Sequence, residues 1–161
     1  MEAIEAEISL ISAVAEHVPV HELLRIHSAL RTQSKSRLLG PNSPGMLHAP
    51  SCCRIGFMPY PQFTPGVIGI VAKSGTLGYE AVASTTRAGL GQSYVVGVGG
   101  DALAGTSLRE ALEMVWEDKG TEGVVVIGEV GGDDELEVAG FVGEKRNKGG
   151  PMKLVLRLSI L

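Results

Sequence analysis

Short apolar runs of strand type alternate with segments of helical periodicity along most of this chain, and no other sequence feature constrains the fold as strongly. Such alternation is typical of stacked βα units around a parallel sheet. The sequence therefore predicts an α/β fold. The expected strands are residues 9–14, 37–39, 67–72, 93–98, 123–127 and 152–156.

The clearest helix signal begins at Ser107, where Ser107 and Glu110 have the spacing of a capping box. Apolar residues then recur on one helix face, namely Leu108, Ala111, Leu112, Val115 and Trp116. Weaker helix signals follow Pro19, Ser74 and Asp133.

A proline-rich stretch over residues 39–65 interrupts the βα rhythm, because prolines cannot donate to a sheet ladder. The part before it offers about two strands and one helix, too little to bury a core. We therefore expect residues 1–57 to be the C-terminal part of a domain whose earlier strands are absent. Residues 58–66 are the expected linker, and residues 67–161 an incomplete flavodoxin-like domain.

Composition and charge reduce the range of partners and cellular compartments to be expected for this chain. A net charge of −4 without long charged runs gives no reason to expect nucleic acid or an anionic membrane. No apolar run is long enough to span a bilayer. The adjacent Cys52 and Cys53 favour a reducing compartment. The acidic N-terminus is unlike a signal peptide or an Arg-rich transit peptide.

Three loops at expected strand ends carry candidate chemistry, because open parallel sheets bind ligands at their carboxyl ends. In the first loop, residues 40–45, Asn42 and Ser43 could present an amide and a hydroxyl to a small carboxylate. A turn of this composition is more often purely structural.

The second loop, residues 72–80, runs from a strand into a helix through small residues that leave backbone N–H groups open to a phosphate. The alternative is that Ser74 only caps the helix. The sequence contains neither a P-loop nor a Gly-x-Ser-x-Gly elbow.

The third loop, residues 128–132, places Glu129 directly after a buried apolar run. A carboxylate in such a position can orient a histidine or accept a proton. A salt bridge or a helix cap explains it equally well.

The four histidines give no metal pattern, and we predict no metal site. Pro19 lies between His17 and His21 and spoils a regular helical pair. His27 falls on an apolar helix face and His48 in the proline-rich stretch. No histidine follows Glu129.

Taken together from Ala3 to Pro151, these motifs resemble the alpha subunit of succinate–CoA ligase. The resemblance is shared in part with ATP-citrate lyase and with ADP-releasing acyl-CoA synthetases. The matching motifs, in order, are Ala-Glu-His-Val-Pro, Gly-Pro-Asn-Ser-Pro-Gly, Lys-Ser-Gly-Thr-Leu-Gly-Tyr-Glu-Ala-Val, Gly-Gln-Ser, Val-Gly-Val-Gly-Gly-Asp and Gly-Glu-Val-Gly-Gly.

This resemblance implies a CoA-binding Rossmann-type domain followed by a flavodoxin-like ligase domain. It implies an enzyme that joins succinate and CoA through a phosphohistidine, with ATP or GTP and Mg bound by a beta subunit. It also implies the mitochondrial matrix in a eukaryote or the cytoplasm in a bacterium. Nucleotide preference and the acyl group stay open.

The resemblance also implies roles for ten residues. Glu129 orients the phosphohistidine, and Tyr79, Asn42 and Ser43 lie on the substrate side. The phosphate-binding residues are Ser74, Gly75 and Thr76, and the CoA-binding residues are Val14, Ala15 and Glu16.

Two parts of the family pattern are not found in the 161 residues. The family's glycine-rich CoA loop precedes the point that matches Met1, and residues 152–161 diverge before the histidine loop. We therefore expect a chain truncated at both ends and inactive alone. It is either a ligase subunit completed by a separate polypeptide or a non-catalytic remnant that docks on a beta subunit or binds a phosphate compound. An unrelated flavodoxin-like binding module is a third interpretation.

Overall fold

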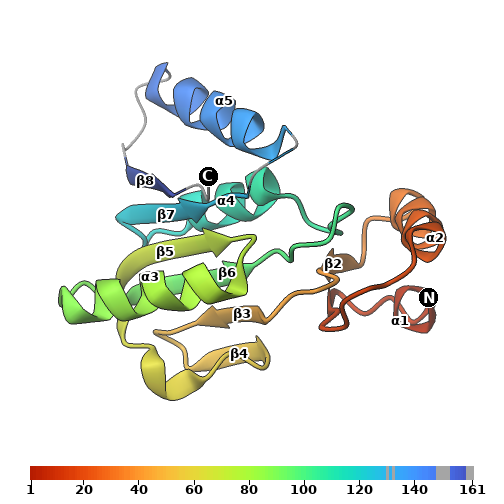
Figure 1. Ribbon diagram of the computed structural model, residues 1–161, viewed down its shortest axis with the longest axis horizontal. Helices are drawn as coiled ribbons and strands as arrows, with labels where there is room; N and C mark the ends of the chain where they lie inside the picture. Colours follow the sequence, from red (N-terminus) through yellow and green to blue (C-terminus); the bar gives the residue numbers. More distant parts are fainter. Residues whose placement is uncertain (130, 132, 148–152, 159–161) are drawn as a thin grey trace.

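The computed structural model describes residues 1–129, 131, 133–147 and 153–158. Its strands form two sheets (Figure 1), a small one of β1 and β2 and a six-stranded one in the order β4-β3-β6-β5-β7-β8. Helices and strands alternate through both parts, so the α/β fold is confirmed. Among the described residues, no helix has the length and apolar character needed to cross a membrane.

The larger sheet is mostly parallel. β5 (Pro65–Ala72) lies between β6 (Gln92–Gly97) and β7 (Gly123–Ile127), and β8 (Leu154–Leu158) pairs with β7, all in parallel. At the other edge, the antiparallel hairpin of β3 (Gly45–His48) and β4 (Cys53–Gly56) pairs with β6. The carboxyl ends of β5, β6 and β7 therefore meet at one edge.

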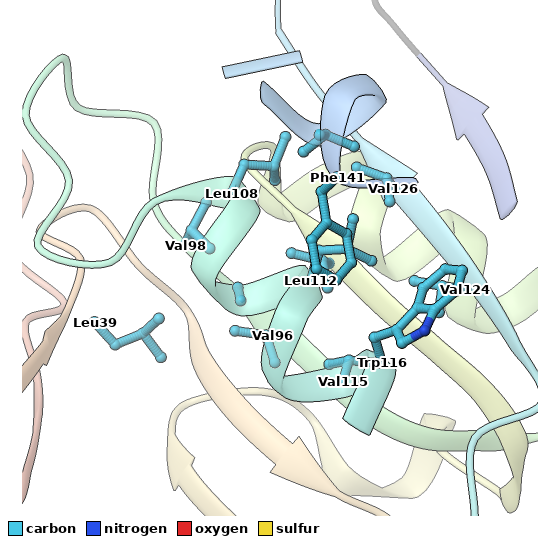
Figure 2. Packing of buried hydrophobic residues seen from close by; sticks show 13 residues of the cluster. Leu39, Val96, Val98, Leu108, Leu112, Val115, Trp116, Val124, Val126 and Phe141 are labelled. Carbon is cyan, nitrogen blue, oxygen red and sulfur yellow. The ribbon is translucent and has the colours of Figure 1, made fainter. Parts of the chain in front are cut away.

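Helices cover both faces of this sheet. α3 (Gly75–Arg87) packs on one face, while α4 (Leu108–Glu117) and α5 (Asp134–Asn147) pack on the other (Figure 1). Figure 2 shows the hydrophobic core between the sheet and the helices α4 and α5. In this core Trp116 of α4 meets Phe141 of α5 edge to face, and the two ring centroids lie 5.7 Å apart. Aromatic pairs favour this geometry, which fixes α5 against α4.

The small sheet belongs to the first part of the chain. β1 (Leu10–Ser12) and β2 (Arg37–Leu39) pair in parallel, with α1 (Glu2–Glu5) before them and α2 (Val20–Arg31) between them. β1 is shorter than the expected run 9–14. β2 has the expected bounds.

The helix predictions are confirmed. Helices begin directly after Pro19, Ser74, Ser107 and Asp133. The Ser107/Glu110 capping box is present in full.

The strand predictions hold for the buried strands and miss one hairpin. β5, β6 and β7 lie close to the expected runs, and β8 begins later than residue 152. Met152 lies outside the described residues. The proline-rich stretch contains β3 and β4, which we did not expect. Pro44 and Pro50 stand just outside these strands, so no ladder hydrogen bond is lost to them.

This hairpin moves the division between the two sheets. Strand pairing places residues 45–56 in the larger sheet, so the sheets separate between Leu39 and Gly45. The expected linker at residues 58–66 instead contains the short 3₁₀ helix η1 (Tyr60–Gln62) and the start of β5.

Candidate functional site

A pocket of about 400 Å³ opens at the carboxyl ends of the parallel strands. Its walls come from the turn before β3, from the junction between β5 and α3, and from the loops that follow β6 and β7. The residues lining it are Val14, Asn42, Ser43, Pro44, Phe57, Lys73, Ser74, Gly75, Thr76, Tyr79, Gly100 and Glu129. Segments more than 100 residues apart in sequence therefore share one pocket.

The pocket brings together all but two of the residues predicted from sequence. Ala15 and Glu16 do not line it, and both are exposed beside Val14. Val14 is 45% exposed, so its apolar side chain is accessible at the rim. The individual roles of these residues stay predictions.

One wall is the N-terminus of α3. Ser74 is the N-cap, and its hydroxyl accepts a hydrogen bond from the Leu77 amide at 3.4 Å. The amides of Gly75 and Thr76 precede Leu77 in the first turn, where a helix offers no backbone acceptor. With the positive end of the helix dipole, these two amides favour an anion in the pocket. The cap interpretation and the phosphate interpretation of Ser74 are therefore compatible.

Another wall carries Glu129, just beyond the end of β7. Its carboxylate lies near Asn42 across Gly100: a Cβ added to Gly100 would be 3.9 Å from Glu129 Oε2 and 3.6 Å from Asn42 Nδ2. No Lys, Arg or His nitrogen of the described residues lies within 4.0 Å of this carboxylate. The pocket thus has an anion-accepting side and a carboxylate side.

Ser43 has a structural role that its position in the sequence did not reveal. The residue is 1% exposed. Its hydroxyl donates to the Gly97 carbonyl at 2.5 Å and accepts from the Gly45 amide at 2.9 Å. The Ser43 hydroxyl therefore joins the turn before β3 to the end of β6. Within this turn, it is the Asn42 side chain whose polar atoms remain available to a ligand.

Tyr79 stands one turn into α3. Burial raises the pKa of its phenol above the ordinary value, so it is a neutral donor at pH 7. Its buried hydroxyl has no hydrogen-bond partner among the described residues. An unpartnered buried donor beside a pocket is a candidate for hydrogen bonding to a ligand.

Four residues that line the pocket were not among the predicted site residues, namely Pro44, Phe57, Lys73 and Gly100. Lys73 precedes the helix cap, and its ammonium lies 2.6 Å from Asp134 of α5. The only sequence signal for Lys73 was its place in the strand-to-helix loop. Phe57 follows the unexpected hairpin and is 57% exposed, and no local pattern pointed to it.

None of the four histidines lines the pocket. The rings of His27 and His48 bond instead to the Leu103 carbonyl and the Ser51 hydroxyl. Within the described ranges, no group of three or more His, Cys, Asp or Glu residues is arranged to hold a metal ion.

The mostly parallel sheet, the helix N-terminus and the Glu129 carboxylate together define an α/β protein with a polar pocket at the carboxyl ends of its parallel strands. Residues 71–159 match the model of the CoA-ligase family. The chain belongs to this family, and its resemblance to succinate–CoA ligase alpha subunits is confirmed.

Curated relatives support this membership along almost the whole chain. The ADP-forming succinate–CoA ligase subunit alpha 2 of Archaeoglobus fulgidus is 43% identical over 144 residues, which are 89% of this chain and 50% of that protein. The mitochondrial subunit alpha-2 of Trichomonas vaginalis is 39% identical over 91% of this chain and 47% of its own length. The chain thus spans about half the length of these relatives.

Among solved structures, the fold is similar to ATP citrate lyase from Methanothrix soehngenii in complex with citrate and coenzyme A. The TM-score is 0.85 and the sequence identity 25%, over 99% of this chain and 26% of that one.

Proposed function

We propose that these 161 residues form the part of a succinate–CoA ligase alpha subunit that receives a phosphorylated imidazole. The observation that carries the proposal is the pairing of two unlike walls in one pocket, the open α3 amides and the Glu129 carboxylate. A ligand that satisfies both has an anionic end and an N–H donor end. A phosphohistidine has both.

In this arrangement, the amides of Gly75 and Thr76 stabilise the phosphoryl oxygens. Glu129 accepts a hydrogen bond from one imidazole nitrogen, which leaves the other nitrogen free to carry the phosphoryl group. Tyr79 and Asn42 supply donors on the succinyl side of the pocket.

The family and the curated relatives support the remaining partners. CoA supplies the thiol of the succinyl thioester, and the exposed apolar side chains of Val14 and Phe57 fit the rim along which its arm would lie. ATP or GTP with Mg belongs to a beta subunit, the partner implied by relatives that are alpha subunits. The compartment follows the host, matrix or cytoplasm.

We further propose that the 161 residues alone transfer no phosphoryl group, because none of their histidines lines the pocket. They then act as a receiving and docking module for a phosphohistidine and a beta subunit. The pocket chemistry of the receiving role is the same whichever polypeptide supplies the histidine.

Calorimetry with a peptide that carries a stable phosphonate analogue of phosphohistidine, whose pyrazole ring keeps an N–H, tests the receiving role. Glu129→Ala should weaken binding about tenfold or more, since a charge-assisted hydrogen bond is lost. Glu137→Ala on the exposed side of α5 is the matched control and should bind as the wild type does. Equal affinities of the two variants would contradict the proposal.

Incubation with γ-labelled ATP or GTP and a beta subunit tests the second part. We expect no acid-labile, base-stable label on this chain, whereas an alpha subunit of a curated relative is labelled. Label on His17, His21, His27 or His48 would show that the chain has its own acceptor.

A further inference from the structure

The first turn of α5 contacts both walls of the pocket. Asp134 Oδ2 lies 2.6 Å from Lys73 Nζ, and Glu135 Oε1 accepts a hydrogen bond from the Glu129 amide at 2.8 Å. We propose that Asp134 and Glu135 are positioning residues that keep the Glu129 carboxylate in place and free for a ligand. This inference rests on the proposed function of Glu129.

Glu135 is built into the fold beneath the Glu129 loop. The residue is only 8% exposed, and a carboxylate is costly to bury unless it is hydrogen-bonded. The Glu129 amide provides such a bond. A Cβ at residue 128 would overlap the Glu135 carboxyl group, so Gly128 lets the carboxylate reach this amide. The bond fixes the backbone from which the Glu129 side chain enters the pocket.

To hold the Glu129 amide, residue 135 needs an oxygen acceptor rather than a negative charge. A backbone N–H donates equally to a carboxylate or to a side-chain amide oxygen, with a weaker bond in the second case. Glu135→Gln should therefore preserve the loop, whereas Glu135→Leu should release it.

Asp134 acts through its charge on Lys73, at the wall formed by the junction of β5 and α3. The Lys73 side chain is 15% exposed and lines the same pocket as Glu129. Asp134 is its ion-pair partner in the part of the chain that the structure describes. The Lys73 amide also donates to the Ile127 carbonyl at 3.0 Å, which holds Lys73 beside the end of β7, two residues before Glu129.

Without the Asp134 charge, the Lys73 ammonium would have no carboxylate partner on α5 and would pair with Glu129, which lines the same pocket. Such an ion pair would compete with the imidazole N–H for the Glu129 carboxylate. Asp134 thus keeps two opposite charges in one pocket apart, and the first turn of α5 serves Glu129 from both sides.

Glu135 is tested without any ligand, by the amide ¹H shift of Glu129 in NMR spectra at pH 7. In the wild type this amide should be downfield, because it donates to the Glu135 carboxylate. Glu135→Gln should keep a downfield amide with a smaller displacement, because a neutral amide oxygen is the weaker acceptor, and Glu135→Leu should move the amide upfield. Glu137→Gln is the matched control and should leave the amide in place. A Glu129 amide at the same shift in Glu135→Leu and in the wild type would overturn the role of Glu135.

Asp134 is tested by a double-mutant cycle with the phosphohistidine-analogue peptide. Asp134→Asn should weaken binding about tenfold, and Asp134→Asn/Lys73→Met should return to within about threefold of Lys73→Met alone. A merely structural role would leave the double variant as weak as Asp134→Asn, which would overturn the inference.

Different results would contradict the proposed function and the positioning role of Asp134 and Glu135. A wild-type chain that does not bind the peptide contradicts the proposed function. A structure of the Asp134→Asn variant still tests Asp134 in that case. It should place the Lys73 ammonium within about 4 Å of the Glu129 carboxylate, the distance of an ion pair. An ammonium that stays away from Glu129 in this variant would refute the charge-separating role.

Discussion

At the scale of single residues, a glycine on the central strand decides how closely a helix approaches the sheet. Gly69 lies in β5, and a Cβ there would overlap Cγ1 of Val115 on α4. Val115 is fully buried, so neither residue has room to move. Gly140 of α5 is exposed, and an added Cβ meets no atom within 4 Å.

We predict opposite effects of the same substitution at these two glycines. Gly69→Ala should lower the free energy of unfolding by about 1–3 kcal/mol, because it overpacks a closed core. Gly140→Ala should raise it by up to about 1 kcal/mol, because alanine is the better helix former. Urea unfolding followed by circular dichroism measures both. A Gly69→Ala variant as stable as the wild type would show that α4 is not tightly packed on β5.

At the scale of elements, α4 is the helix with the best-defined start. The Ser107 hydroxyl accepts from the Glu110 amide at 3.1 Å, and the Ser107 amide donates to Glu110 Oε2 at 2.9 Å. These bonds satisfy backbone donors that a helix start otherwise leaves unpaired. Because the buried face of α4 contributes much of one core, its start also fixes how that core is packed.

Removing this cap should be measurable without changing the core. Ser107→Ala should lower the free energy of unfolding by about 1 kcal/mol, the usual cost of losing such a cap. Glu113→Ala, at an exposed site in the same helix, should change it by less than about 0.5 kcal/mol. If chemical denaturation gave equal stabilities for the two variants, the capping box would contribute nothing.

At the scale of the whole molecule, the two sheets differ in how well they are supported. The six-stranded sheet has a core on each face, whereas β1 and β2 form a two-stranded sheet. Several large apolar side chains near it are exposed, namely Met1, Ile8, Leu10, Val14, Val20 and Leu24. A two-stranded sheet has little stability of its own.

Hydrogen exchange should show this difference directly. We expect the Ile11 amide of β1 to exchange at least about tenfold faster than the Ile70 amide of β5, because the small sheet can open without the large one. Mass spectrometry or NMR after transfer to deuterated buffer measures both rates. Equal protection would mean that the two sheets unfold as one cooperative unit.

The sequence by itself was sufficient for the features encoded within a few neighbouring residues. Helix starts after Ser74 and Ser107 follow from side chains that cap amides one turn away. The buried strands β5 and β7 are continuous apolar runs, which parallel strands covered on both faces require. The common position of the loops after these strands follows from parallel order alone.

Only the tertiary structure decided the contacts that join distant segments. Whether Gly45–His48 pairs with β6 depends on an open sheet edge, which no local pattern around the prolines reveals. The pairs of Asp134 with Lys73 and of Glu135 with the Glu129 amide likewise exist because α5 returns across the ends of β5 and β7. Local periodicity and capping act over one or two turns of chain, whereas the final shape of the pocket comes from packing between elements tens of residues apart.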